Sequence, residues 1–174
     1  MNHKRIPQLG TFLILAMVVI LAGTVPAAAM AERIYYTGED CPIEFGTPVR
    51  QWTSEDGVLH IRGLPMTTRL TYDLPYLNGL NYIIANQDVD LATGAVHVYG
   101  TVEIHPYSGQ GTWVGSFSTH VTPEGVLSGR SVVHGTGEWE GMISFNEISS
   151  PEAPNLDCFN MNTAGNGYIL IPHQ

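Results

Sequence analysis

The stretch GAVHVYGTVEIHPYSGQGTWVGSFSTHV, residues 94–121, decides the fold class of this chain, together with LSGRSVVHGTGEWEGMISFNEI, residues 127–148. Both are short alternations of apolar and polar residues, interrupted by glycine about every ten residues. Alternation with a period of two predicts strands, and breaks this close together leave no room for crossover helices. The two stretches therefore predict an antiparallel meander.

The rest of the chain shows weaker strand patterns. Residues 32–56 look irregular apart from one short strand near their start. The expected strands are 33–37, 58–63, one within 64–73, 81–91, 95–105, 112–121, 126–134, 138–148 and 167–171. Sequential strands of this kind favour an all-β fold with a single antiparallel barrel of about eight strands, because closure removes exposed edges. A β-sandwich is the alternative.

The alternation also assigns faces to the strands. One face of strand 95–105 is apolar, with Val96, Val98, Val102 and Ile104, and the opposite face is polar. In strand 112–121 the bulky set is Trp113, Phe117 and Val121. In strand 138–148 we expect Trp139, Ile143 and Phe145 to share the core face. The pattern leaves open whether the polar face lies against solvent or lines a cavity.

Residues 1–31 have the pattern of a secretory signal peptide. Lys4 and Arg5 precede an apolar stretch at 12–25, and the small residues Ala29 and Ala31 then permit cleavage after Ala31. The stretch is shorter than the roughly 20 residues that a membrane-spanning helix needs. We therefore expect residues 32–174 to form one secreted domain, extracellular or periplasmic, with an uncleaved anchor as the alternative.

The expected mature domain is strongly acidic. Removal of Lys4 and Arg5 from the seven basic residues leaves five against 16 Asp and Glu, a net charge of −11 with neutral histidines. Such a surface repels phosphate groups, so neither nucleic acid nor, after cleavage, an anionic membrane is expected as a partner. The sequence does not predict an oligomeric state.

Two cysteines, Cys41 and Cys158, lie near the two ends of the expected mature domain. A lone pair in an oxidising compartment usually forms a disulfide. Acidic residues precede both cysteines, and negative charge disfavours the alternative of a reactive thiolate. A Cys41–Cys158 disulfide is therefore predicted.

The stretch from Gly129 to Phe145 resembles the closing hairpin of the allene oxide cyclase and dirigent barrels. In those proteins a strand runs into Gly-Thr-Gly, followed by an aromatic residue and a strand containing glycine; Gly135-Thr136-Gly137, Trp139 and Gly141 match that pattern. The resemblance implies an eight-stranded antiparallel barrel with an apolar cavity for a small organic ligand. No catalytic residue of either group can be matched to a position here.

Four residues are candidates for ligand contact in such a cavity. Arg130 and His134 share one face of their strand and would bind an anionic head group if that face lined the cavity. Trp113 and Trp139 would supply aromatic wall. The alternative places Arg130 and His134 on the solvated surface.

Metal and cofactor sites are not expected. The histidines of the strands, among them His97, His120 and His134, could supply imidazole ligands, but zinc needs three or four ligands that converge on one point. The sequence contains no HExxH, CxxC or EF-hand spacing to support such a site. Histidines on a solvated strand face are the favoured interpretation.

Three functions remain open at this point. The first is a secreted barrel that binds a small apolar ligand in a cavity lined by aromatic and aliphatic residues. The second is a structural or protein-interaction domain with a filled core, for which the segment 74–77 (LPYL) is a candidate exposed apolar patch. The third is an enzyme of the cyclase or isomerase type, which needs a titratable residue inside the barrel. The apolar strand faces show no convincing titratable residue, so an enzyme is not the favoured expectation.

Overall fold

The computed structural model describes residues 31–152, 158 and 162–172. The predicted signal peptide, apart from its last residue, lies outside the described residues. No helix in the described ranges is long and apolar enough to cross a membrane.

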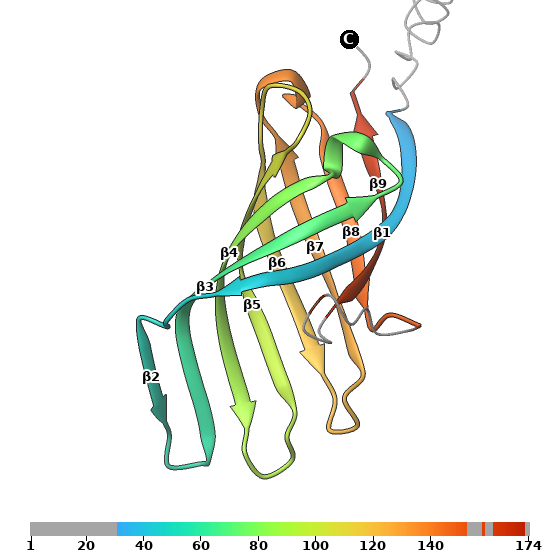
Figure 1. The fold of residues 1–174 in the computed structure, drawn as a ribbon. Coiled ribbons are helices and arrows are strands. Elements are labelled where there is room, and N and C mark those ends of the chain that lie inside the picture. The colour runs from blue at the N-terminus through green and yellow to red at the C-terminus, as the bar shows by residue number, and fades with distance from the viewer. Residues whose placement is uncertain (1–30, 153–157, 159–161, 173–174) are drawn as a thin grey trace, which may run out of the picture. The chain divides into compact units, whose positions relative to one another are not determined.

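The described chain is built from strands and two short 3-10 helices, η1 and η2 (Figure 1). The elements are β1 Glu32–Phe45, β2 Arg50–Thr53, β3 Val58–Tyr72, η1 Pro75–Leu77, β4 Gly79–Asp90, β5 Val96–Pro106, β6 Trp113–Val121, β7 Leu127–Gly135, η2 Gly137–Trp139, β8 Ile143–Ser149 and β9 Thr163–Ile171. The predicted strands at 95–105, 112–121 and 126–134 are confirmed to within one residue at each end.

The strands close into a barrel. From β3 to β9 each strand pairs antiparallel with the next, and β1 then pairs with both β9 and β3. Eight strands therefore form a closed antiparallel barrel, which confirms the predicted fold class and excludes the sandwich. β2 is an additional strand that pairs only with the first part of β3.

β1 and β3 are longer than the sequence predicted. β3 runs unbroken through both predicted segments because Gly63, with φ of 64°, sits where the β3–β4 register shifts between Ile61 and Leu64. Positive φ at such a bulge suits glycine. The first part of β3 pairs with β2, and the second part pairs with β1. The prediction that residues 32–56 are mostly irregular was wrong, because β1 continues to Phe45 along β3.

The prediction of a strand over 138–148 was also wrong at its start. Residues 137–139 form η2, Gly141 turns the chain with φ of 85°, and β8 begins only at Ile143. Trp139 is buried, but Phe145 lies on the outside of β8 and stacks on Tyr168 at 5.2 Å between ring centroids. The interrupted strand thus turns Ser144, and not Ile143 or Phe145, toward the interior.

One end of the barrel is filled by apolar side chains from the two short helices. Leu77 of η1 and Trp139 of η2 are buried in the same cluster as Trp113 and Ile169. The predicted exposed patch at 74–77 is therefore not one, since Leu77 is 2% exposed and the indole nitrogen of Trp113 donates to the Tyr76 carbonyl at 3.3 Å.

A disulfide joins Cys41 on β1 to Cys158, as predicted. The two cysteines are 117 positions apart, and both are buried. The bond therefore fixes the middle of β1 to the chain segment between β8 and β9.

Candidate functional site

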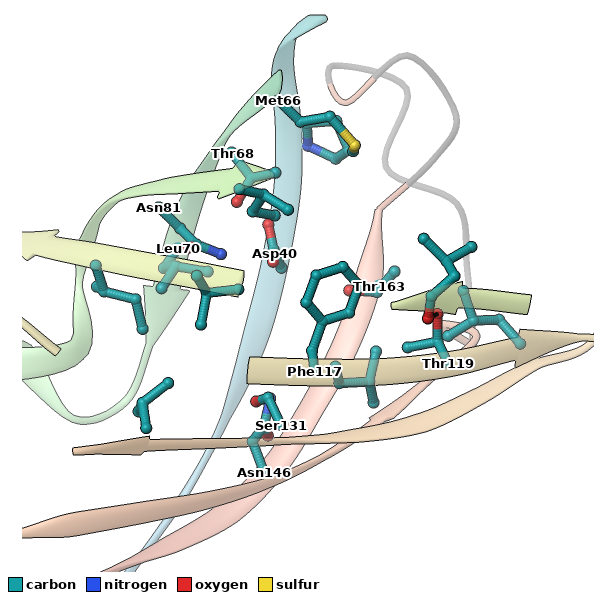
Figure 2. Close-up of a pocket in the computed structure, with 18 of the residues that line it drawn as sticks. Asp40, Met66, Thr68, Leu70, Asn81, Phe117, Thr119, Ser131, Asn146 and Thr163 are labelled. Atoms are coloured by element: carbon teal, nitrogen blue, oxygen red, sulfur yellow. Dashed lines mark hydrogen bonds between the residues drawn. The ribbon is translucent and has the colours of Figure 1, made fainter. Parts of the chain in front are cut away.

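The interior of the barrel contains a partly open cavity of about 350 Å³ (Figure 2). All eight strands of the barrel contribute to its wall. Most of the wall is apolar, and includes Met66, Leu70, Ile83, Val98, Val102 and Phe117. Because side chains alternate across a strand, the apolar face predicted for β5 is the face that lines the cavity. The polar face of β5 lies on the outside of the barrel.

A pair of tyrosines forms part of the polar wall. The Tyr36 hydroxyl lies 2.7 Å from the Ser144 Oγ, and the side-chain amide of Asn146 donates to the Tyr72 hydroxyl at 3.4 Å. Burial raises the pKa of Tyr36 to about 12, partly offset by the Ser144 hydrogen bond. Burial also raises the pKa of Tyr72 far above its ordinary value. Both phenols are therefore neutral hydrogen-bonding groups over the physiological pH range.

Asp40 is the charged residue of the wall. It lies on β1, opposite Leu70 of β3 and Thr163 of β9, and its side chain faces the cavity (Figure 2). Burial raises its pKa to about 6, an effect that the side chains of Thr68 and Asn81 partly offset. A carboxyl group that titrates near neutral pH inside a cavity is a frequent feature of functional sites.

Several polar atoms around Asp40 have unused hydrogen-bonding capacity. Thr68 and Asn81 are cross-strand neighbours on β3 and β4, on the same side of the cavity as Asp40 (Figure 2). Among the described residues, four of these atoms have no hydrogen bond of normal length and angle. They are Oδ1 of Asp40, Oγ1 of Thr68 and Oδ1 of Asn81, and, across the cavity, Oδ1 of Asn146. Buried polar atoms are normally paired, so the cavity offers unmet hydrogen-bonding capacity to an occupant.

The sequence did not single out these residues. Asp40 lies in a part of β1 whose hydrophobic pattern predicts irregular structure, so its inward position does not follow from the pattern. The available signal was weak: Tyr36, Gly38 and Asp40 alternate with exposed residues, which places Asp40 on the same face as a buried tyrosine. Thr68 and Asn81 likewise occupy inward positions of their strands.

The four predicted ligand contacts lie outside the cavity wall. Arg130 and His134 are exposed on the outer face of β7. Trp113 and Trp139 stack on each other at the filled end of the barrel, with ring centroids 5.9 Å apart. The structure thus brings the two tryptophans together, but places neither pair among the residues that line the hollow.

The histidines considered as metal ligands lie on the outside. His97 and His120 stack face to face at 4.2 Å between centroids, on neighbouring strands. His134 pairs with Val114, six positions along β6 from His120. In the described ranges no group of three or more His, Cys, Asp or Glu could hold a metal ion.

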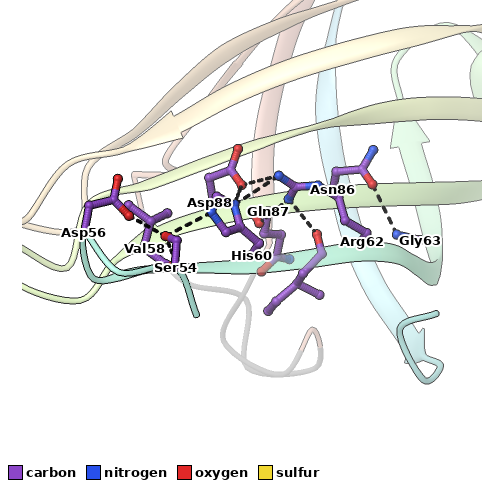
Figure 3. A network of polar contacts seen from close by, with 10 residues as sticks. Ser54, Asp56, Val58, His60, Arg62, Gly63, Asn86, Gln87 and Asp88 are labelled. Carbon is purple, nitrogen blue, oxygen red and sulfur yellow. Dashed lines mark hydrogen bonds and ion pairs between the residues drawn. The ribbon is translucent and has the colours of Figure 1, made fainter. Parts of the chain in front are cut away.

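A second polar cluster lies where β2, β3 and β4 meet on the outer surface (Figure 3). His60 contacts Asp88 through Nδ1 at 2.6 Å and Ser54 Oγ through Nε2 at 3.3 Å. This order of groups is that of a nucleophilic Ser-His-Asp site. However, the Ser54 hydroxyl also donates to the Val58 carbonyl at 3.0 Å and contacts Asp56.

Arg62 occupies the same cluster. Its guanidinium contacts Asp88 at 2.6 Å and the Gln87 carbonyl at 2.8 Å (Figure 3). Burial of Asp88 raises its pKa, but hydrogen bonds from His60 and Arg62 outweigh this and hold the pKa below its ordinary value. The cluster therefore ties the β2 hairpin to the barrel and is best explained as structural.

Comparisons with known proteins assign no family to the chain. No protein-family model matches it, and no curated protein matches it. The cavity is therefore the feature of this chain that bears most directly on function.

Proposed function

We propose that this protein is a secreted barrel that binds a small, largely apolar molecule in its cavity. The observation that supports the proposal is the hollow of about 350 Å³ with an apolar wall and a few polar groups. Ligand sites are typically concave and mostly apolar, with volumes of about 300–1,000 Å³ and a small number of placed polar groups. A filled core, the structural alternative, would leave no such space.

Two further observations agree with this proposal. The Cys41–Cys158 disulfide suits a protein exported to an oxidising compartment, and residues 1–31 suit a signal peptide. A closed barrel is also what the resemblance of residues 129–145 to the closing hairpin of allene oxide cyclase and dirigent barrels implies. Similarity of fold does not determine function, so the proposal of ligand binding depends mainly on the cavity.

Native mass spectrometry of residues 32–174, purified from an export host without reductant, tests the proposal. We expect a bound small-molecule mass that is lost on gentle activation. Val98→Phe places a larger side chain in the cavity from β5 and should abolish the bound mass. Thr101→Phe, on the outer face of the same strand, should leave the bound mass unchanged. A bare protein mass, with no uptake of apolar compounds by the unmodified protein, would contradict ligand binding.

Asp40 favours a second function, an enzyme of the cyclase or isomerase type. A cavity carboxyl with a pKa of about 6 is suited to move a proton to or from a bound substrate near neutral pH. The ligand recovered from the protein should then exchange a carbon-bound hydrogen for deuterium in D₂O, and Asp40→Asn should abolish the exchange. Binding without exchange would support the binding protein alone.

A further inference from the structure

The polar side of the cavity indicates which chemical class of ligand it takes. Among the described residues that line the cavity, Asp40 alone bears a formal charge, and neither lysine, arginine nor histidine is present in the wall. A carboxylate that turns into a mostly apolar cavity and has no counter-ion there is unfavourable, because the low-dielectric surroundings replace part of its hydration. A cation brought by the ligand would supply the missing counter-ion.

The unused hydrogen-bonding capacity beside Asp40 fits the same ligand. Oδ1 of Asp40 and Oδ1 of Asn81 are acceptors, and Oγ1 of Thr68 has free acceptor capacity. A protonated primary amine offers three donors from one nitrogen and can meet several of these acceptors together. A carboxylate or phosphate ligand offers only acceptors and negative charge, so it would be repelled by Asp40.

The remaining wall fits an apolar body attached to that amine. Aliphatic side chains and Phe117 form most of the surface, and the rings of Tyr36 and Tyr72 adjoin it. Aromatic faces also attract organic cations. The net charge of −11 expected for residues 32–174 would raise the local concentration of cations around the protein.

From this geometry we propose that the cavity binds an organic cation, an apolar molecule whose protonated amine lies against Asp40. This inference rests on the proposed ligand-binding function and adds to it the charge of the ligand and the residue that recognises it.

Three compounds with one skeleton and different head groups test the inference: 2-naphthylmethylamine, 2-naphthalenemethanol and 2-naphthoic acid. Titration calorimetry at about pH 8 should show the amine binding at least about tenfold more tightly than the alcohol, with the acid weakest, since the ammonium group supplies the counter-charge for the Asp40 carboxylate as well as hydrogen bonds, whereas the alcohol supplies a hydrogen bond alone. Asp40→Asn should reduce the preference for the amine to within about twofold, because it should weaken the binding of the amine far more than that of the uncharged alcohol. Asp90→Asn, the same change at a turn outside the cavity, should keep the preference.

A pH series on the unmodified protein gives an independent readout that needs no variant. The titratable groups of the described wall are Asp40, Tyr36 and Tyr72, and the pKa values of both tyrosines are raised by burial. Between about pH 8 and pH 5, therefore, only Asp40 changes charge within the wall. Amine affinity should fall about tenfold over this range, and the affinity of the uncharged alcohol should change by much less.

The outcomes separate the inference from the proposed function. Equal affinity for amine and alcohol would overturn the organic-cation proposal and leave apolar ligand binding intact. A preference for the acid would overturn it as well. Uptake of none of the three compounds, together with a bare native mass, would overturn both.

Discussion

Tyr36 and Tyr72, on the paired strands β1 and β3, pack edge to face on the inner surface of the barrel, with ring centroids 5.1 Å apart and ring planes at 83°. The pair depends on two glycines of β9. A Cβ at Gly165 would lie 2.5 Å from the Tyr72 hydroxyl oxygen, and one at Gly167 would lie 2.8 Å from the Tyr36 ring. The missing side chains on β9 thus create the space in which the tyrosines define one wall of the cavity.

Gly165→Ala should destabilise the protein by about 1–3 kcal/mol, because its methyl group would overlap the Tyr72 ring. Without the overlap, the same change would be neutral or stabilising, since alanine restricts the unfolded chain. Urea unfolding of the two single variants and of Gly165→Ala/Tyr72→Phe measures the coupling. We expect the double variant to lose at least about 0.5 kcal/mol less than the sum of the singles; simple additivity would refute the contact.

Asp40→Asn should stabilise the ligand-free protein at about pH 8 and not at about pH 4. The folded-state pKa of about 6 lies above the unfolded value of 3.8, so folding favours the protonated acid. Stability is therefore lost as pH rises between these two values, by up to about 3 kcal/mol when both forms are ionised. Asparagine cannot ionise and avoids this loss. Thermal unfolding at the two pH values measures it.

Asp90→Asn is the matched control, and it should change the stability of the protein in the opposite direction. Hydrogen bonds from the Thr93 hydroxyl and from the backbone of Ala92 and Thr93 lower the pKa of Asp90. Its contribution to stability is present at neutral pH and is lost as pH falls through the lowered pKa. Asp90→Asn should therefore destabilise at about pH 8 and have little effect in acid. If both variants shifted stability in the same direction, the assignment of Asp40 to a desolvating interior would be wrong.

Loss of the disulfide should cost about 2–5 kcal/mol, because the bond closes a loop of more than 100 residues in the unfolded chain. Cys41→Ala/Cys158→Ala and the reduced unmodified protein should unfold at similar, lower urea concentrations. A loss below about 1 kcal/mol in both would show that the loop constraint contributes little.

Trp52→Ala should loosen the β2 hairpin and leave the barrel folded. The indole stacks on His60 at 4.8 Å, and Arg50 and Arg62 lie over it at 4.4 and 5.3 Å. Hydrogen exchange should show about a tenfold loss of protection in β2, as expected for two exposed cation–π contacts, with barrel strands unchanged. Tyr107→Ala, at an exposed aromatic residue, serves as the control. Equal loss of protection in β2 and the barrel strands would contradict the separation of the hairpin from the barrel.

The sequence predicted the barrel well where alternation is regular and glycine marks the turns. In β5 the inward positions follow directly from Val96, Val98, Val102 and Ile104. The pattern failed in β1, because the residues around Asp40 and Pro42 do not alternate in hydrophobicity. Their strand conformation is imposed by pairing with β9 and β3, which are distant in sequence.

The candidate site was harder to predict for the same reason. Asp40, Thr68 and Asn81 are polar residues at inward positions, where a pattern-based assignment expects apolar ones. The sequence pattern instead suggested Arg130 and His134 as ligand contacts, but both side chains lie on the outer face of the barrel. Such polar exceptions to the pattern are expected at functional sites.

Because β1 must pair with β9 to close the barrel, folding can be completed only when the last strand is available. The first strand of the domain finds one of its two partners only when the last strand is present, and such distant pairings form slowly. If the chain crosses a membrane N-terminus first, as the proposed export implies, β1 emerges before β9. The edge of β1 that pairs with β9 then stays unpaired until β9 has emerged. During that interval the unpaired edge of β1 would be available for pairing with another chain.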